Sequence, residues 1–188
     1  MSIVLRQHIE EIVAVTDSEF EYIQSLFTHK KLKKHQYLVQ EGTLVTHEYF
    51  VLNGLLKASY TNEAGKEHII QFAMENWWVT DYQAYITQRQ ATLNIDCIEA
   101  SELLSISFEN KKLLCAELHK MEYFFRMKAS LGYVAMQQRI LSLLNNDARL
   151  RYEQLMQQYP TLLQRVPKLL IASYLGVSRE TLSRFSAS

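Results

Sequence analysis

The chain has 188 residues, 48% of them hydrophobic, with only 5 Gly and 2 Pro, which excludes a disordered or linker-like protein and allows a sizeable core. Lys and Arg together number 20, as do Asp and Glu, so the formal net charge is zero. No apolar run approaches the roughly 18 residues of a membrane span, and the start MSIVLRQHIEEIV is too acidic for a signal peptide. The two cysteines, Cys97 and Cys115, follow no disulfide spacing. We therefore expect a cytoplasmic location and no membrane partner.

The first segment, residues 4–29, has a helical pattern, and Thr16 or Asp17 is suited to cap a helix over SEFEYIQSLF. From about Leu32 the residue composition and periodicity change from helical to strand-like. Three runs are rich in β-branched and aromatic residues and are separated by turn signals: LKKHQYLVQEG, HEYFVLNGLLKASYTNEAGKEHIIQFA and TLNIDCIEASELLSIS. Short strands joined by turns in this way predict an antiparallel sandwich or barrel.

Helical periodicity returns at Phe108, where residues 108–118 predict a short helix and residues 121–146 a long one. The long helix carries a stripe at steps of three and four: Phe124, Met127, Leu131, Val134, Gln138 and Leu141. This spacing is close to that of a coiled-coil seam, so these residues are predicted to form the interface of a homodimer. The stripe is equally compatible with packing on the protein's own β-domain.

The C-terminal segment reads as a helical module that contains a helix-turn-helix unit. One helix is predicted over about Lys168–Leu175, Gly176 supplies a tight turn, and Ser178 is a good N-cap for a second helix from Arg179 onward. Ala172 must be small, because the two helices cross there. Three apolar residues are expected to fill the space between them: Leu175, Val177 and Leu182.

This segment is also basic. Residues 149–188 carry six basic and two acidic residues, a formal charge of +4, against −4 for the rest of the chain, which suggests a polyanionic partner. The second helix of such a unit enters the major groove of double-stranded DNA, where arginine can pair with guanine and glutamate with cytosine. The predicted DNA-binding residues are Ser178, Arg179, Glu180, Thr181, Ser183 and Arg184. The alternative is a solvated amphipathic helix that closes the domain.

The stretch IASYLGVSRETLSR resembles the recognition motif of the CRP/FNR family of transcription regulators, the catabolite activator protein and its relatives. The resemblance implies that Arg179, Glu180 and Arg184 read bases. It covers most of the chain and implies an α+β fold, with an N-terminal antiparallel β-roll (a jelly-roll of the cyclic-nucleotide-binding type). The expected domains are a sensor-like β-roll with flanking helices at 1–118, a dimerisation helix at 119–146 and a helix-turn-helix DNA-binding domain at 147–188.

One departure concerns the family's phosphate-binding cassette, which reads Gly-Glu and then, after a short loop, Arg-Ser or Arg-Thr. The matching positions are Thr80-Asp81 and Ala91-Thr92, so the Gly and the Arg are missing, and Arg89 is displaced by two residues. Because a buried phosphate without a cationic partner is costly, we do not expect cyclic AMP to bind. Candidate residues for a different effector pocket are Trp77, Trp78, Asp81, Tyr82, Arg89 and Thr92, together with Tyr85, although aromatic residues at such spacing are more often core.

The other departure is at the end of the sequence. Only three residues follow Phe185, so we expect the β-hairpin wing that often follows the recognition helix in the family to be absent. DNA affinity is then expected to depend on the recognition helix, its flank and the dimer.

Other chemistry finds little support in the sequence. The six histidines (8, 29, 35, 47, 68 and 119) do not pair at the spacings of metal ligands, and two cysteines cannot hold an iron–sulfur cluster. No Gly-rich phosphate loop or nucleophile elbow is present. We therefore predict no metal, no cofactor, no catalytic residues and no enzyme activity. A cupin-like metalloenzyme and a small-molecule-sensing β-roll with a tail that no longer binds DNA are the alternatives to a homodimeric transcription regulator.

Overall fold

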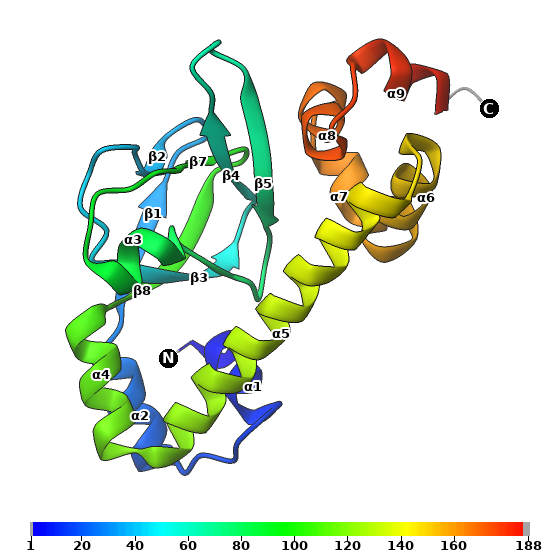
Figure 1. Ribbon diagram of the computed structural model, residues 1–188. Helices are drawn as coiled ribbons and strands as arrows, with labels where there is room; N and C mark the ends of the chain where they lie inside the picture. Colours follow the sequence, from blue (N-terminus) through cyan, green and yellow to red (C-terminus); the bar gives the residue numbers. More distant parts are fainter. Residues whose placement is uncertain (1, 186–188) are drawn as a thin grey trace. The chain divides into compact units, whose positions relative to one another are not determined.

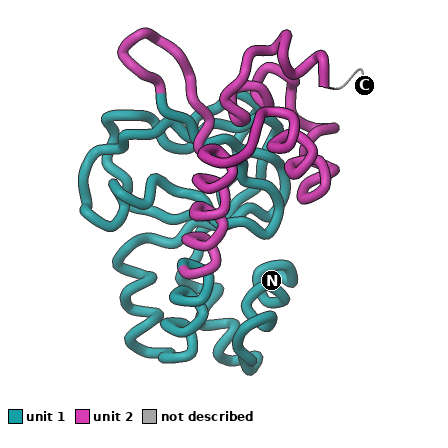
Figure 2. The backbone as a smooth tube through the Cα atoms, turned by 45° about the vertical axis from the view of Figure 1, so that its right-hand side comes forward, with its two compact units in different colours: residues 1–60, 71–129 teal, residues 61–70, 130–188 magenta. Residues whose placement is uncertain are grey.

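The computed structural model describes residues 2–185, which form two compact units. The first consists of Met1–Tyr60 with Gln71–Ala129, and the second of Thr61–Ile70 with Ser130–Ser188 (Figure 2). Helices flank two antiparallel sheets and more helices follow them, which confirms the predicted α+β class (Figure 1). The two units divide the chain differently from the expected domains, because a segment within the β-roll sequence groups with the C-terminal helices.

Two short helices open the chain, α1 (Ile3–Glu10) and α2 (Asp17–Ser25). Thr16 caps α2 through a capping box: its hydroxyl accepts from the Glu19 N–H at 3.3 Å, and the Glu19 carboxylate accepts from the Thr16 N–H at 2.8 Å. The helical segment expected over 4–29 is two helices, and the predicted cap at Thr16 is confirmed. The cap at Thr16 starts the second helix, and the residues after it join a strand.

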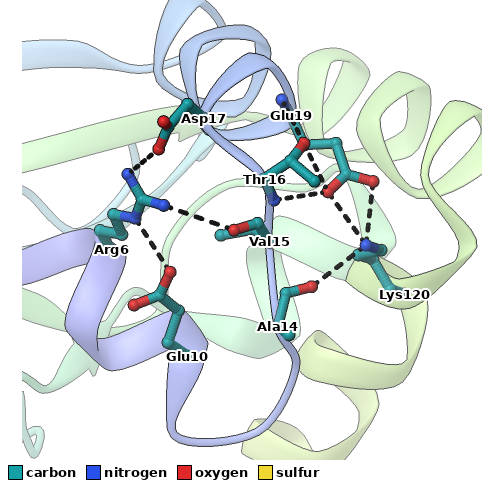
Figure 3. Close-up of polar contacts among 8 residues, drawn as sticks. All are labelled: Arg6, Glu10, Ala14, Val15, Thr16, Asp17, Glu19 and Lys120. Atoms are coloured by element: carbon teal, nitrogen blue, oxygen red, sulfur yellow. Dashed lines mark hydrogen bonds and ion pairs between the residues drawn. The ribbon is translucent and has the colours of Figure 1, made fainter.

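Ion pairs fasten these helices to their surroundings (Figure 3). Arg6 of α1 donates to Asp17 at the start of α2 at 2.6 Å. Lys120, from the later helix α5 (His119–Asn145), lies 2.9 Å from the carboxylate of Glu19. The first turn of α2 is thus tied both to α1 and to the start of the long helix.

The β-roll is built from two four-stranded antiparallel sheets. Its strands within residues 2–185 are β1 (Thr28–Leu32), β2 (Tyr37–Val39), β3 (His47–Asn53), β4 (Leu56–Thr61), β5 (Glu67–Ala73), β6 (Trp78–Val79), β7 (Asn94–Cys97) and β8 (Ser101–Ser107). One sheet has the order β1-β8-β3-β6 and the other the order β2-β7-β4-β5. The antiparallel sandwich or barrel predicted from the strand texture is confirmed.

The two faces of the first sheet pack against different partners. Phe50 of β3 pairs with Leu104 of β8, and both belong to the cluster that includes the flanking helices. The next pair along, Val51 and Leu103, belongs to the cluster inside the β-roll. This alternation follows from the two-residue period of a strand, and it gives the roll one core within and one core under its helices.

Helix α3 (Tyr82–Thr87) was not predicted from the sequence. Asp81 caps its start, and Gln88 ends it in the left-handed region with φ of 52°. Ala84 and Tyr85 are buried in the core inside the β-roll. Its six residues are too few for a helical period to stand out from the apolar run around them.

Helix α4 (Phe108–Glu117) and helix α5 confirm the predicted short and long helices. The assignment of Phe124 to a dimer seam is wrong, because its side chain is fully buried in the core under the first sheet, beside Leu5 and Phe50. For this residue the alternative holds, in which the stripe packs on the protein's own β-domain. Phe124 is buried because α1 packs beside α5, and the spacing of apolar residues along α5 does not predict that contact.

Four further helices follow within the described part of the chain: α6 (Ala148–Gln158), α7 (Pro160–Arg165), α8 (Lys168–Leu175) and α9 (Arg179–Phe185). The bounds of α8 and the start of α9 confirm the prediction. Helix α7 was not separated in the sequence; Pro160 occupies its first turn, where the missing N–H costs nothing. Residues 186–188, on which the expectation about the wing rests, lie outside the described residues.

Candidate nucleic-acid interface and effector region

Helices α8 and α9 meet at a tight turn. Gly176 ends α8 with φ of 70°, and the Val177 N–H donates to the carbonyl of Ala172 at 3.0 Å, so the left-handed residue closes the helix as glycine does best. Ala172 is buried together with Leu175 and Leu182. The burial of Ala172, Leu175 and Leu182 agrees with the sequence-based expectation, whereas Val177, the third residue expected to fill the space, is only half-buried.

Ser178 begins α9. Its hydroxyl accepts from the Thr181 N–H at 3.2 Å, which confirms the predicted N-cap. Leu182 is buried, and the residues two before and two after it, Glu180 and Arg184, are exposed on the opposite side of the helix. Arg179, in the first turn, is also exposed. The three side chains predicted to read bases therefore face solvent and not the protein's own interior.

The charged side chains of α9 have polar partners within the helix's own first turn. The pKa of Glu180 is lowered because its carboxylate accepts from its own backbone N–H and from the Ser178 hydroxyl, with Arg179 nearby. The guanidinium of Arg184 donates to the Thr181 hydroxyl at 3.4 Å. Helix α9 thus presents a carboxylate acceptor in its first turn, at Glu180, and a guanidinium donor in its last turn, at Arg184, both exposed.

Some basic residues of this segment serve the protein itself. The guanidinium of Arg151 donates to the carbonyl of Leu175 through Nε at 3.2 Å and Nη2 at 2.9 Å, and to the carbonyl of Asn146 through Nη1 at 2.7 Å. Arg149 pairs with Glu153 at 3.0 Å. One of the six basic residues counted in this segment, Arg151, therefore caps the end of α8 and is engaged within the protein.

In the β-roll, the structure brings Asp81 and Thr92 together. Asp81 is buried, and its Oδ1 accepts from the Ala84 N–H at 3.1 Å. Its Oδ2 accepts from the Thr92 N–H at 2.7 Å, the Thr92 hydroxyl at 3.1 Å and the Leu93 N–H at 3.1 Å. Converging N–H and hydroxyl donors of this kind make anion sites, and here the chain's own carboxylate fills the site.

The other residues predicted for an effector pocket do not converge on this site. Trp78 is a core residue: its ring centroid lies 5.2 Å from that of Phe50 and 5.5 Å from that of Phe125. Trp77 packs against the core inside the β-roll, and Arg89 is exposed. The predicted pocket is therefore not assembled, because its two tryptophans contribute to two different cores.

Tyr82, which is 44% exposed, instead joins a polar network around the buried carboxylate of Glu48. Its hydroxyl donates to Glu48 of β3 at 2.6 Å, and the ammonium of Lys111 of α4 donates to the other oxygen of the same carboxylate. Glu48 is 4% exposed, so these two donors supply the hydrogen bonds that solvent cannot. The network joins α3, α4 and β3, and no motif in the sequence pointed to it.

A cavity of about 350 Å³ lies beside this network. It is lined by Tyr85 and Ile86 of α3 and by residues of α4 that include Phe108, Lys111 and Cys115. Burial raises the pKa of Tyr85, and its hydroxyl has no hydrogen-bond partner. Burial also raises the pKa of Cys115 to about 12, so this thiol is not a nucleophile at neutral pH.

The C-terminal half of α5 has an exposed apolar surface. Leu131, Val134 and Leu141 are 54%, 45% and 49% exposed, and Gln138 between them is also exposed. Met127 is half-buried. Apolar side chains that stay this exposed along a helix mark an interaction surface.

Within residues 2–185, no group of three or more His, Cys, Asp or Glu side chains is arranged to hold a metal ion. Among the helices of this same range, none has the length and apolar character needed to cross a membrane.

Comparison with known proteins finds a family model that matches the β-roll. Residues 29–117 match the family model of the cyclic nucleotide-binding domain. A 104-residue part of the chain is 25% identical to the anaerobic regulatory protein of Bacillus subtilis. That alignment spans 55% of this chain and 42% of the relative, so less than half of the relative's length is matched.

Solved structures resemble a larger part of the chain. The regulator CLP of Xanthomonas campestris, described as responsive to c-di-GMP, has a TM-score of 0.74 at 14% identity and covers 92% of this chain and 90% of its own. FixK2 of Bradyrhizobium japonicum has a TM-score of 0.74 at 14% identity, covering 86% and 83%. A CRP/FNR-family protein from Eubacterium rectale has a TM-score of 0.70 at 15% identity, covering 91% and 82%. Residues 29–117 are therefore similar to a cyclic nucleotide-binding domain, and the chain has the same fold as these solved structures, one of which is a CRP/FNR-family protein.

Proposed function

We propose that the protein is a sequence-specific DNA-binding transcription regulator of the CRP/FNR type that acts as a homodimer. The observation that carries the proposal is the exposure of Arg179, Glu180 and Arg184 on a helix whose start is fixed by Ser178 and whose apolar side is buried at Leu182. Major-groove readers present donors and acceptors from the first turns of the recognition helix in this manner. The curated relative and the similar structures are regulators, which supports the same reading.

The exposed apolar surface of α5 supports the dimer. Leu131, Val134 and Leu141 lie on one side of the helix, where a second copy would cover them. A two-fold dimer would present two recognition helices about 34 Å apart, one turn of DNA. The expected target is an inverted repeat.

The β-roll is the part of the chain on which an effector would act. The carboxylate of Asp81 already takes the hydrogen bonds of Thr92 and Leu93, so a cyclic phosphate placed there would meet a negative charge. We therefore expect no binding of cyclic AMP. Calorimetry with cyclic AMP tests this, and micromolar affinity would contradict it.

The test of DNA binding is selection from random duplex DNA, followed by binding measurements on the enriched sequence. Arg179→Ala is expected to weaken binding by about 1–3 kcal/mol and to relax one base position. Arg149→Ala is the matched control, because it removes the same charge from an exposed arginine that pairs with Glu153. If no inverted repeat is enriched, the regulator proposal fails. A β-roll sensor whose tail does not bind DNA is then the remaining candidate.

A further inference from the structure

The helices of the second unit are fastened to the main chain of strand β5. This strand is last in the order β2-β7-β4-β5, so one side of it has no neighbouring strand. The hydroxyl of Ser173 in α8 donates to the carbonyl of Glu67 at 2.8 Å, and Nη2 of Arg139 in α5 donates to the carbonyl of Ile69 at 2.9 Å. Residues two apart on a strand direct their carbonyls to the same side, so both donors bind one edge. All four residues belong to the second unit (Figure 2).

Arg139 joins the strand to α8 through a single nitrogen. The same Nη2 donates to the carbonyl of Tyr174, one residue before the end of α8, at 3.0 Å. Its guanidinium carbon lies 3.5 Å from the centroid of the Tyr174 ring. Among the described residues it forms an ion pair with no carboxylate, and burial lowers its pKa. The partial negative charge at the C-terminus of α8 offsets the guanidinium charge instead.

A second arginine completes the arrangement. Arg151 donates to the carbonyl of Leu175, the last residue of α8. The carbonyls of Tyr174 and Leu175 are therefore held by arginines from α5 and α6, immediately before the turn at Gly176. Because the turn at Gly176 directly follows these two residues, contacts that hold their carbonyls also constrain the direction of α9.

We propose that Arg139 and Ser173 are positioning residues that lock α8, and with it the recognition helix, onto the edge of β5. The inference rests on the proposed function, because the position of α9 affects DNA binding only if α9 is a recognition helix. The lock makes main-chain contacts, so it does not depend on which side chains occupy positions 67 and 69. It also provides a physical route by which a change in the β4–β5 hairpin reaches the DNA-binding helix.

The helix-turn-helix itself does not need the lock in order to fold. Ile171, Ala172 and Leu175 are buried, and Ile171 lines a small cavity together with Leu163 of α7 and Leu182 of α9. Removing the lock therefore leaves a folded but loosely held module. The two recognition helices of a dimer must bind DNA at a fixed spacing. A loosely held module has to be ordered when it binds, and this loss of conformational entropy lowers its DNA affinity. In a locked module that entropy has already been lost in the free protein.

The experiment combines DNA titration at several salt concentrations with hydrogen exchange on the free protein. We expect Arg139→Ala to weaken binding of the selected duplex on the order of tenfold and Ser173→Ala to weaken it several-fold. Neither change should alter the dependence of affinity on salt, since a lost phosphate contact lowers that slope by about 0.9. Arg139→Lys keeps the charge but lacks the planar fork, and we expect it to restore part of the affinity. Arg149→Ala is the charge-matched control, with wild-type affinity expected.

Hydrogen exchange tests the lock without DNA. In Arg139→Ala and Ser173→Ala, amides of residues 61–70 and of α8 should exchange faster, while those of α1 and β3 keep wild-type rates. Unchanged exchange at 61–70, unchanged affinity, or a salt slope lowered by about one unit would each overturn the proposal. If the wild-type protein selects no DNA, the proposed function fails on its own, and the exchange experiment still decides whether the lock exists.

Discussion

The indole N–H of Trp78 donates to Nε2 of His8 across 3.2 Å, joining strand β6 to the first helix of the chain. The ring of His8 is buried between Phe50 and Phe124, with centroid distances of 4.8 and 5.8 Å. A histidine that accepts this hydrogen bond must be neutral at Nε2. The helix α1 is therefore held in place by an unprotonated imidazole.

This predicts a loss of stability in mild acid. Burial, followed by the charge of Lys128, lowers the pKa of His8 to about 4, and Glu11 opposes this only in part. Since the unfolded chain takes up the proton near pH 6.5 and the folded one does not, stability falls as the pH drops from about 6.5 to 4, by about 2–3 kcal/mol in total. Urea unfolding at several pH values measures the change.

His8→Gln keeps an acceptor for the indole but does not titrate, so its stability should vary less over this pH range than that of the wild type. His119→Gln, at an exposed position, is the control and should keep the wild-type variation. Equal variation in His8→Gln and the wild type would contradict the assignment.

Asp81 is predicted to be a main support of the loop after α3. Asp81→Ala leaves the buried N–H of Ala84 and the part-buried N–H groups of Thr92 and Leu93 without their acceptor, and should cost about 2–4 kcal/mol in unfolding free energy. Asp81→Asn keeps one acceptor oxygen and should cost less. Chemical denaturation measures both, and equal stability of Asp81→Ala and the wild type would show that the loop is held by other contacts.

Two glycines with positive φ should respond differently to alanine. At Gly54, with φ of 106°, an added Cβ would lie 2.7 Å from the carbonyl oxygen of Ala100, so Gly54→Ala should cost about 3 kcal/mol or more. At Gly176, with φ of 70°, nothing lies within 4 Å, and only the left-handed backbone is disfavoured, by about 1–2 kcal/mol. Thermal unfolding of the two variants compares them, and a larger effect at Gly176 would refute the ranking.

The dimer proposal predicts different effects on two sides of α5. Leu131→Glu places a charge in the proposed seam and should shift the protein from dimer to monomer. Tyr133 is more exposed, at 71%, but lies two residues on, toward the other side of the helix, so Tyr133→Glu should remain a dimer. Sedimentation equilibrium distinguishes the two, and dissociation by Tyr133→Glu with a dimeric Leu131→Glu would place the interface elsewhere.

The sequence by itself determined the features that depend on neighbouring residues. The capping box at Thr16, the turn at Gly176 and the N-cap at Ser178 are each formed by residues within five positions of one another. A local hydrogen bond needs no distant partner, so its chemistry is legible in a short stretch. For the same reason, the motif on α9 can be recognised from its consecutive residues alone.

Only the tertiary structure decided the features that join distant segments. The stripe on α5 divides at the point where α1 covers it, so Phe124 is core and Leu131 is exposed. Arg151 counted as a free charge in the sequence, but it caps α8 24 residues away. Asp81 was aligned with a ligand-binding position, and the loop brings Thr92 to it from 11 residues away. The sequence shows which side chains are apolar or charged and at what spacing they recur. Which residue each of them contacts depends on how distant segments pack together in the fold.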